Sequence, residues 1–362
     1  MKHIWVLLIS VLLCSHPQRV FSQSTLKAEV LAGSDFRGFL DGQGEKTMFD
    51  KPTAIAVDKE GVVYVWDSIN RRIRRITKDG AVTSHPRGTL GDVTSLASLP
   101  EGKIAVADGG RIRVFDSSGN VSDMSDTRFG SMSAIAVDLD GSILVADTGN
   151  NKIHRVSTNG QVTTLAGSGN RATVDGEGLF SSFSDPDGIA VNSVGTIFVH
   201  QANESIRTIQ KTGRVQTTQL RSGSKHMVFD STDKLYVASG SHVLQYSPNF
   251  VEGYTFNVAI AVGGIAVDSD DNIFVSDSGG NKIYRVPSPS KQVLSSTILS
   301  IKMYPGVTIT GQAPGNYRIE ATDTLEGRWI PLEIIQLNDS PRLWIDQTSV
   351  NGQRFYRAVL LE

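Results

Sequence analysis

A short pattern of alternating apolar residues and turn residues recurs along this chain and constrains its fold more than any other feature. In its clearest copy, Ile135–Val156, apolar residues alternate through three runs separated by the turn sequences Asp-Leu-Asp-Gly and Thr-Gly-Asn-Asn. Alternation with a period of two predicts β-strands, and Gly with Asn or Asp between two such runs predicts a tight turn. Each copy is therefore expected to form three antiparallel strands.

The copies follow one another at intervals close to 40 residues, apart from one longer interval. The last residues of their first strands are Asp58, Leu99, Asp138, Asn192, Asp230 and Asp268. After the third run, a turn glycine leads into a fourth, β-branched run, as at Gly160–Leu165. Four-stranded units of this length, which cannot bury both faces alone, are typical of β-propellers. We predict an all-β fold with a six-bladed β-propeller, and we name the strands of a blade a to d.

The repeats resemble the NHL-repeat family of β-propellers, whose units contain sequence motifs similar to GIAVD, NIYVADTGNNRI and TLAG. The likeness is carried by Gly188–Asn192, Leu144–Ile153 and Thr164–Gly167 and extends over about residues 26–290. The second and fifth blades depart from it, with Leu96–Leu99 and Met227–Asp230 as first strands and no Asn-Asn turn. The resemblance implies an NHL-type propeller of an exported bacterial kind.

The first residues have the composition of a secretory signal. Residues 1–23 hold a short positive start, an apolar run of 11 residues at Ile4–Cys14, and short residues at Val20–Ser22. We expect cleavage here, with retention as a membrane anchor as the alternative. Cys14 is the only cysteine, so the mature protein would contain no disulfide, which favours a bacterial periplasmic or extracellular protein.

Leu26–Gly33 is similar in sequence to the fourth strand at Val162–Gly167, but it precedes the first blade. The sixth blade has no clear fourth strand of its own. We therefore expect this segment to complete the sixth blade and to close the ring, because an open edge would leave unpaired backbone groups. Gln292–Leu294 is the alternative donor.

Two connections are unusually long and nearly identical. Gly33–Pro52 and Gly167–Pro186 each contain Asp-Gly-x-Gly followed by Phe and Pro, and they enter blades that are three apart. We expect these two inserts to lie across the ring from each other. We also expect them to gather, with the turns between strands b and c, around the mouth of the central channel, the face where we place function.

The sequence changes character after the repeats. We assign residues 24–287 to the propeller, the Pro- and Ser-rich residues 288–297 to a linker, and residues 298–362 to a small β-sandwich. About six short strands are expected in this last part, with Tyr317 and Trp329 in its core.

Two rings of residues from the first strands should surround the channel mouth. One ring comprises Thr53, Thr94, Ser133, Asp187, Lys225 and Gly263, and the next comprises Ala54, Ser95, Ala134, Gly188, His226 and Gly264. A metal-dependent lactonase or lyase would need several carboxylates, amides or histidines here. With one Asp, one Lys and one His, no catalytic or metal set is complete, and we assign no catalytic residue, metal or cofactor.

Trp66 and His200 occupy the end of strand b, where other blades have small residues, and both belong to blades with inserts. One interpretation places them in a ligand site, with Trp66 as an exposed aromatic; the other has them packing beneath the inserts. The ligand-binding candidates are Trp66, Asp187, His200, Lys225 and His226.

The remaining polar features are interpreted as structural. Aspartates in the a-to-b turns, such as Asp140 and Asp270, and those that end strand b, such as Asp147, are expected to cap turns. The cluster Arg71–Arg75 is expected to be a solvated blade edge, and the formal net charge of −2 favours no nucleic-acid partner.

We therefore predict an exported, monomeric protein that binds a protein, peptide or glycan at the cell envelope or outside the cell, without a membrane span once the signal is removed. The alternative is a metal-dependent lyase or lactonase.

Overall fold

The computed structural model describes residues 28–84, 90–116, 118–221, 225–250 and 252–288, and five strands within residues 306–361. This part of the chain is built of β-strands, with four short 3-10 helices and no α-helix. It divides into two compact units, one holding β1 to β26 and the other β27 to β31. None of its helical segments has the length and apolarity to cross a membrane.

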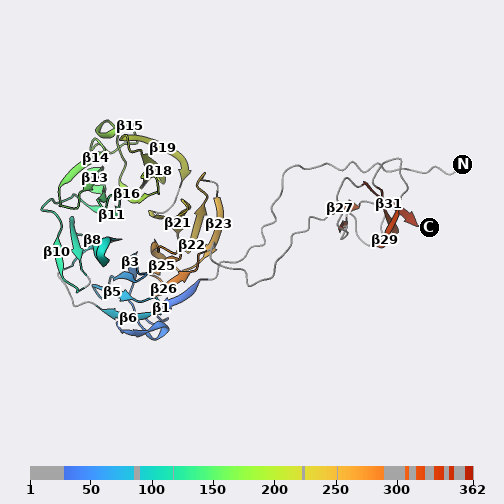
Figure 1. Ribbon diagram of the computed structural model, residues 1–362, viewed down its shortest axis with the longest axis horizontal. Helices are drawn as coiled ribbons and strands as arrows, with labels where there is room; N and C mark the ends of the chain where they lie inside the picture. The colour runs from blue at the N-terminus through green and yellow to red at the C-terminus, as the bar shows by residue number, and fades with distance from the viewer. Residues whose placement is uncertain are drawn as a thin grey trace. The chain divides into compact units, whose positions relative to one another are not determined.

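The strands of the first unit form six antiparallel sheets, which are the blades of a ring (Figure 1). The first blade contains β3 (Pro52–Val57), β4 (Val63–Asp67), β5 (Arg72–Ile76) and β6 (Ala81–Ser84). The second contains β7 (Val93–Ser98), β8 (Ile104–Asp108), β9 (Arg111–Phe115) and β10 (Val121–Asp123). The third contains β11 (Met132–Val137), β12 (Ile143–Asp147), β13 (Lys152–Val156) and β14 (Val162–Ala166). The fourth contains β16 (Pro186–Val191), β17 (Ile197–Gln201), β18 (Ser205–Ile209) and β19 (Arg214–Arg221). The fifth contains β20 (His226–Phe229), β21 (Leu235–Ser239), β22 (His242–Tyr246) and β23 (Glu252–Asn257). The sixth contains β24 (Val262–Val267), β25 (Ile273–Asp277), β26 (Lys282–Val286) and β1 (Glu29–Ala32). The predicted six-bladed propeller is confirmed.

The N-terminal strand closes the ring. β1 pairs antiparallel with β26, with Val30 opposite Tyr284 and Glu29 opposite Arg285. Strands from the two ends of the repeat region therefore share one blade, as predicted. The alternative donor, Gln292–Leu294, lies outside the described residues.

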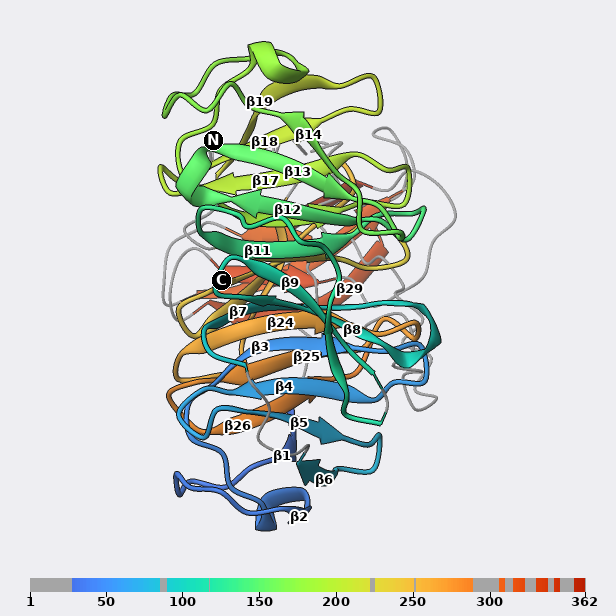
Figure 2. The same ribbon diagram turned by 90° about the vertical axis from the view of Figure 1, so that its left-hand side faces the viewer.

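The core lies between the blades. Figure 2 shows the sheets stacked face to face around the ring. Every residue of β4, β8, β12, β17 and β25 is buried. These are b strands, each the second of its blade. A b strand has a neighbouring blade against each of its faces, so both of its faces are apolar and its sequence does not alternate.

The aspartates of the turns act as caps, as predicted. In the a-to-b turn of the sixth blade, Asp268 Oδ1 accepts hydrogen bonds of 2.9 Å from the backbone N–H groups of Asp270 and Asn272. At the end of strand b in the same blade, Asp277 Oδ1 accepts from the N–H groups of Ala261 and Gly280 at 3.0 and 2.9 Å. These carboxylates hold the connections between strands in place.

The two inserts add a fifth strand at the outer edge of their blades. β2 (Gly42–Gln43) pairs with β6, and β15 (Gly176–Glu177) pairs with β19; each is followed by a 3-10 helix, η1 (Gly44–Lys46) or η4 (Gly178–Phe180). In Figure 1, β15 and β6 lie at opposite edges of the ring, as expected for inserts three blades apart. The expectation that the inserts gather around the channel mouth is wrong for these segments, because the Asp-Gly-x-Gly sequence extends the sheet outwards.

The second unit contains a two-stranded and a three-stranded antiparallel sheet. Its strands are β27 (Gly306–Ile309), β28 (Gly315–Thr322), β29 (Ile330–Leu337), β30 (Arg342–Ile345) and β31 (Phe355–Leu361). β27 pairs with β30, and β28 lies between β29 and β31. About six strands were expected here, and five lie within the described residues. Trp329 and the side chain of Tyr317, the two expected core aromatics, lie outside the described part of the chain.

Candidate ligand site in the central channel

The first strands of all six blades enclose a cavity of about 340 Å³ along the axis of the ring. Each first strand starts on the face that carries the b-to-c turns, called here the b–c face, and ends at its a-to-b turn. At the b–c end the lining includes Thr94, Ser133, Asp187, Lys225, His226 and Gly263. At the other end it includes Val57, Ser98, Val137, Val191, Phe229 and Val267. The channel is therefore polar at one end and largely apolar at the other.

The predicted convergence of first-strand residues is confirmed for most of both rings. Asp187, Lys225 and His226 are the titratable side chains of the lining, and all three come from the fourth and fifth blades. Thr53 and Gly188, which belong to the predicted rings, are not part of the lining itself. One side of the channel mouth thus concentrates the groups that can exchange protons or carry charge.

Asp187 and His200 form a close pair beside the channel. The Asp187 Oδ1 atom lies 2.6 Å from His200 Nδ1, and the His200 side chain is only 5% exposed. The two residues lie on neighbouring strands, β16 and β17. A carboxylate that accepts from one ring nitrogen sets the orientation of the imidazole and determines which tautomer is present.

Gly188 explains how the fourth and fifth blades approach so closely at this point. A Cβ atom at Gly188 would lie 2.4 Å from the backbone oxygen of Lys225 and 2.9 Å from the Cβ of His200. Only glycine leaves room for both contacts. The glycine of the repeat therefore brings the Asp187–His200 pair next to Lys225 and His226.

His226 is uncharged at neutral pH. Burial lowers the pKa of His226 to about 4, and the positive charge of Lys225 adds to the effect, while Asp187 opposes it. The channel mouth therefore combines an acidic side chain, a basic side chain and a neutral imidazole.

The rest of the mouth is lined by small side chains that join the blades. Thr94 Oγ1 donates to the Met132 backbone oxygen at 2.8 Å, and Ser95 Oγ accepts from the Ile135 N–H at 3.2 Å. These bonds connect the second and third blades and keep the side chains against the wall. Both side chains also line the cavity, so this side of the channel presents hydroxyl groups that are already engaged between the blades.

Trp66 is not part of this site. Its side chain is 3% exposed and packs in a cluster with Leu90 and Val93, between the first and second blades. The interpretation of Trp66 as an exposed aromatic is wrong, because its side chain is buried. The end of strand b faces the neighbouring blade, where Trp66 fills space that an alanine leaves to other side chains elsewhere in the ring.

The described residues contain no group of three or more His, Cys, Asp or Glu side chains placed to hold a metal ion. What the site offers to a ligand is the carboxylate of Asp187, the ammonium group of Lys225 and the imidazole of His226.

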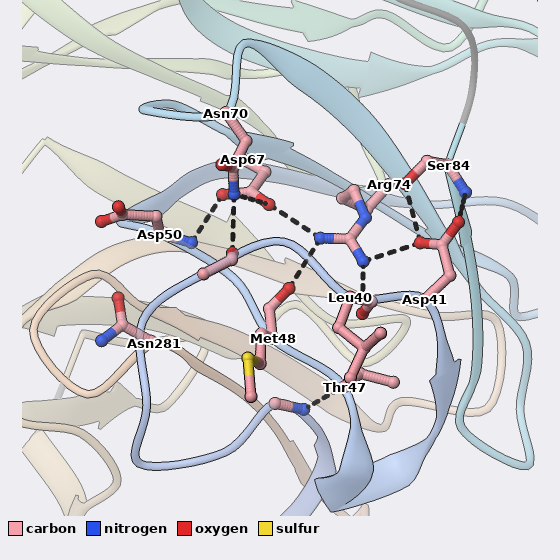
Figure 3. Close-up of polar contacts among 12 residues, drawn as sticks. Leu40, Asp41, Thr47, Met48, Asp50, Asp67, Asn70, Arg74, Ser84 and Asn281 are labelled. Carbon is pink, nitrogen blue, oxygen red and sulfur yellow. Dashed lines mark hydrogen bonds and ion pairs between the residues drawn. The ribbon is translucent and has the colours of Figure 1, made fainter.

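Arg74 corrects the interpretation of Arg71–Arg75 as a solvated edge. Its side chain is fully buried, and Figure 3 shows its guanidinium group between the insert and the end of strand b. Nη1 donates to the Met48 backbone oxygen and Asp67 Oδ2, both at 2.8 Å. Nη2 donates to the Leu40 backbone oxygen at 2.9 Å and to Asp41 Oδ1 at 2.8 Å. Arg74 therefore clamps the first insert to its blade.

Arg207 forms the same clamp in the fourth blade. It donates to the backbone oxygens of Ser182 and Val174 at 2.8 and 2.9 Å and to Asp175 Oδ1 at 2.8 Å. Burial acts to raise the pKa of Asp175, but hydrogen bonds from Thr217 and Arg207 outweigh it and the pKa is lowered. An arginine in strand c of both blades that follow an Asp-Gly insert is the sequence signal that identifies this clamp.

Comparisons with known proteins agree with the fold. A profile of the teneurin NHL domain matches residues 46–157. Teneurin-3 of Danio rerio is 26% identical over 209 residues, a region that covers 49% of this chain and 7% of teneurin-3. The chain thus corresponds to a small part of that relative.

Several solved propellers have a similar structure at low sequence identity, which indicates a shared fold. A gluconolactonase from Xanthomonas campestris superimposes with a TM-score of 0.56 at 14% identity, covering 72% of this chain and 89% of the other. A calcium-binding protein, regucalcin, from Agrobacterium tumefaciens gives a TM-score of 0.52 at 14% identity, covering 68% and 93%. The repeats, the ring of six blades and the profile match over residues 46–157 together support an NHL-repeat β-propeller.

Proposed function

We propose that this protein is an exported binding module that takes a peptide or glycan group into the b–c end of its channel. The observation that carries the proposal is the convergence of Asp187, Lys225 and His226 on one side of a cavity of about 340 Å³. Cavities of roughly 300–1,000 Å³ with a few convergent polar groups are typical of ligand sites. An acceptor, a cation and a neutral imidazole together suit the hydroxyl and amide groups of sugars and peptides.

The cellular setting is part of the proposal. The signal-like residues 1–23 support export, in keeping with a bacterial envelope or extracellular protein that acts as a monomer. We also propose that residues 298–362 form a small β-sandwich module after a linker at 288–297. Limited proteolysis near residues 288–296 should then release a folded C-terminal fragment, whereas failure to isolate one would contradict an independent module.

A ligand screen tests the channel. We expect peptide or glycan fractions to raise the melting temperature of the purified protein. Asp187→Asn should weaken the apparent affinity at least tenfold, because loss of a hydrogen bond to a charged group costs about 1.5–3 kcal/mol. His226→Ala should weaken it less, because the neutral imidazole supplies an uncharged hydrogen bond worth about 0.5–1.5 kcal/mol. Asp140→Asn, in an a-to-b turn at the other face, is the control and should leave binding intact. Binding that survives both channel variants but not the turn variant would place the site on the opposite face.

The second candidate is an enzyme of the lactonase or lyase type. The specific observation in its favour is the Asp187–His200 pair beside a neutral His226, because a carboxylate-oriented imidazole within 2.6 Å of its partner is suited to proton transfer. The likeness to a gluconolactonase extends only to the fold, but it shows that such chemistry occurs on similar rings.

Elemental analysis separates the two candidates. A stoichiometric zinc or calcium ion in the purified protein, lost in Asp187→Asn or His226→Ala, would favour the enzyme. Ligand binding by protein without such a metal would favour the binding module.

A further inference from the structure

A second polar cavity lies on the b–c face over the second blade. It is a groove of about 740 Å³ whose lining includes Arg71, Arg111, Arg113, Arg128, Asp92 and Asp108. The lining has four guanidinium groups and two carboxylates, and a third carboxylate, Asp123, pairs with Arg111 and Arg113. One positive charge remains in excess, so the groove favours anions. It shares no lining residue with the channel, and an inference about it stands independently of the channel ligand.

The groove contains an arginine at the same strand position as the two clamps. Arg113 in β9 pairs with Val106, as Arg74 pairs with Val65 and Arg207 with Val199. The equivalent residues of the other blades are His154, Leu244 and Tyr284, opposite the matching valines. Three blades therefore carry an arginine at this point of strand c.

The surroundings of Arg113 differ from those of the two clamp arginines. In the first and fourth blades, an insert lies across the guanidinium group and supplies an Asp carboxylate together with the backbone carbonyl of the preceding residue. The connection that leads into the second blade is much shorter and has no Asp-Gly-x-Gly sequence. Arg113 Nε instead lies 3.4 Å from Asp108 and 3.3 Å from Asp123, and its side chain is 17% exposed in an open groove.

We propose that this groove binds an extended acidic peptide segment of a partner protein, which takes the place that the inserts occupy in the first and fourth blades. An Asp or Glu carboxylate of the partner meets the arginines of the groove, and its backbone carbonyls accept hydrogen bonds from exposed arginines such as Arg128. Arginine suits this role because its planar guanidinium group presents several donors to carboxylate and carbonyl oxygens at once. The two inserts are segments of this same chain that arginines of the ring hold through such contacts.

The test uses a labelled, end-capped peptide with the sequence of residues 38–45, GFLDGQGE, and the purified full-length protein. We expect saturable binding by fluorescence anisotropy that weakens as NaCl is raised, because exposed charges are screened by salt. The same peptide with Asp41→Asn should bind at least about tenfold more weakly, since a charge-assisted hydrogen bond is lost.

Two protein variants locate the site. Arg128→Gln removes the charge of an exposed lining residue, and Arg113→Gln removes the arginine that matches the clamps. Both should weaken peptide binding, while Arg155→Gln, which removes an arginine that pairs with Asp138 and Asp140 in an a-to-b turn, should not. If Arg113→Gln fails to fold, the effect of Arg128→Gln on peptide binding alone shows whether the peptide binds in the groove.

Either of two results would overturn the proposal. Peptide binding that is unchanged in both groove variants would place the peptide elsewhere, and a peptide that fails to bind at low salt would contradict it directly. Heparin serves as the competing anion: if heparin binds in a manner that depends on Arg113 and Arg128 and the peptide does not, the partner is an acidic glycan and the peptide proposal is wrong.

Discussion

Arg74 Nη1 lies 2.8 Å from Asp67 Oδ2, and neither side chain is exposed to solvent. The pair joins strand c to the end of strand b, and the same guanidinium group reaches the insert at Leu40, Asp41 and Met48. The Arg74 guanidinium also lies over the rings of Phe39 and Phe49, 4.8 and 4.5 Å from their centroids. One buried cation thus organises the outer part of the first blade.

We expect Arg74→Met to lower the free energy of unfolding by about 3–5 kcal/mol, because it leaves the Asp67 carboxylate buried without its cation. Urea denaturation followed by circular dichroism measures the change. Arg155→Met provides the matched control, because Arg155 belongs to a partly exposed ion pair and its loss should cost no more than about 1 kcal/mol. Equal losses in the two variants would contradict the clamp.

Removal of residues 26–33 should destabilise the whole propeller, because β1 supplies the outer strand of the sixth blade and joins the two ends of the ring. We expect a single thermal transition shifted downwards by clearly more than about 2 °C, the shift that 1 kcal/mol produces in a domain of this size. Truncation before Ala28 keeps β1 and should melt like the full chain. A β1 deletion that melts within this margin would show that the strand does not secure the ring.

Trp66→Ala should lower stability by about 3–5 kcal/mol, as expected when a large aromatic side chain is removed from a packed core. The loss comes from the cluster with Leu90 and Val93, so the interface between the first and second blades is weakened. Phe36→Ala is a suitable comparison, because Phe36 is 72% exposed and its loss should change stability by no more than about 0.5 kcal/mol. Chemical denaturation of the two variants side by side distinguishes core packing from surface exposure.

Stability should fall as the pH drops from about 6.5 towards 4 because of His226. The pKa of His226 is lowered from 6.5 to about 4 in the folded protein. On acidification the histidine of the unfolded chain is therefore protonated at a higher pH than that of the folded protein, and this protonation stabilises the unfolded state. The contribution is fully present above pH 6.5, and on the order of 1–3 kcal/mol of it is lost by pH 4. Since carboxylates also titrate at the acid end, the measured quantity is the difference between the parent and His226→Gln; parallel pH profiles would contradict the prediction.

The ring, its blade count and its closure could be predicted from the sequence because they depend on local repeats. The spacing of first strands indicates six blades, and the likeness of Leu26–Gly33 to Val162–Gly167 identifies the closing strand. The first-strand positions also predict the channel lining, since equivalent residues of a symmetric ring point towards the same axis.

The environment of individual side chains was harder to predict, because it depends on contacts between residues far apart in the chain. Trp66 and His200 occupy equivalent positions, yet Trp66 fills the space between two blades while His200 turns to Asp187. Arg74 looks exposed in a row of arginines and is buried because Asp41, from the preceding connection, covers it. Periodicity specifies the strand and the face, but not which neighbour completes the contact.

The two clamps also bear on the origin of the ring. Gly33 and Gly167, Asp41 and Asp175, and Pro52 and Pro186 are separated by the same number of residues, so the inserts repeat with a period of three blades. An ancestor of three blades, later duplicated, accounts for this offset. A half-ring cannot close on itself, so such an ancestor would have completed its circle by pairing with a second copy, and fusion would then have freed each half to diverge. On this view, Trp66 and His200, at the equivalent ends of β4 and β17, mark a position at which the two halves differ.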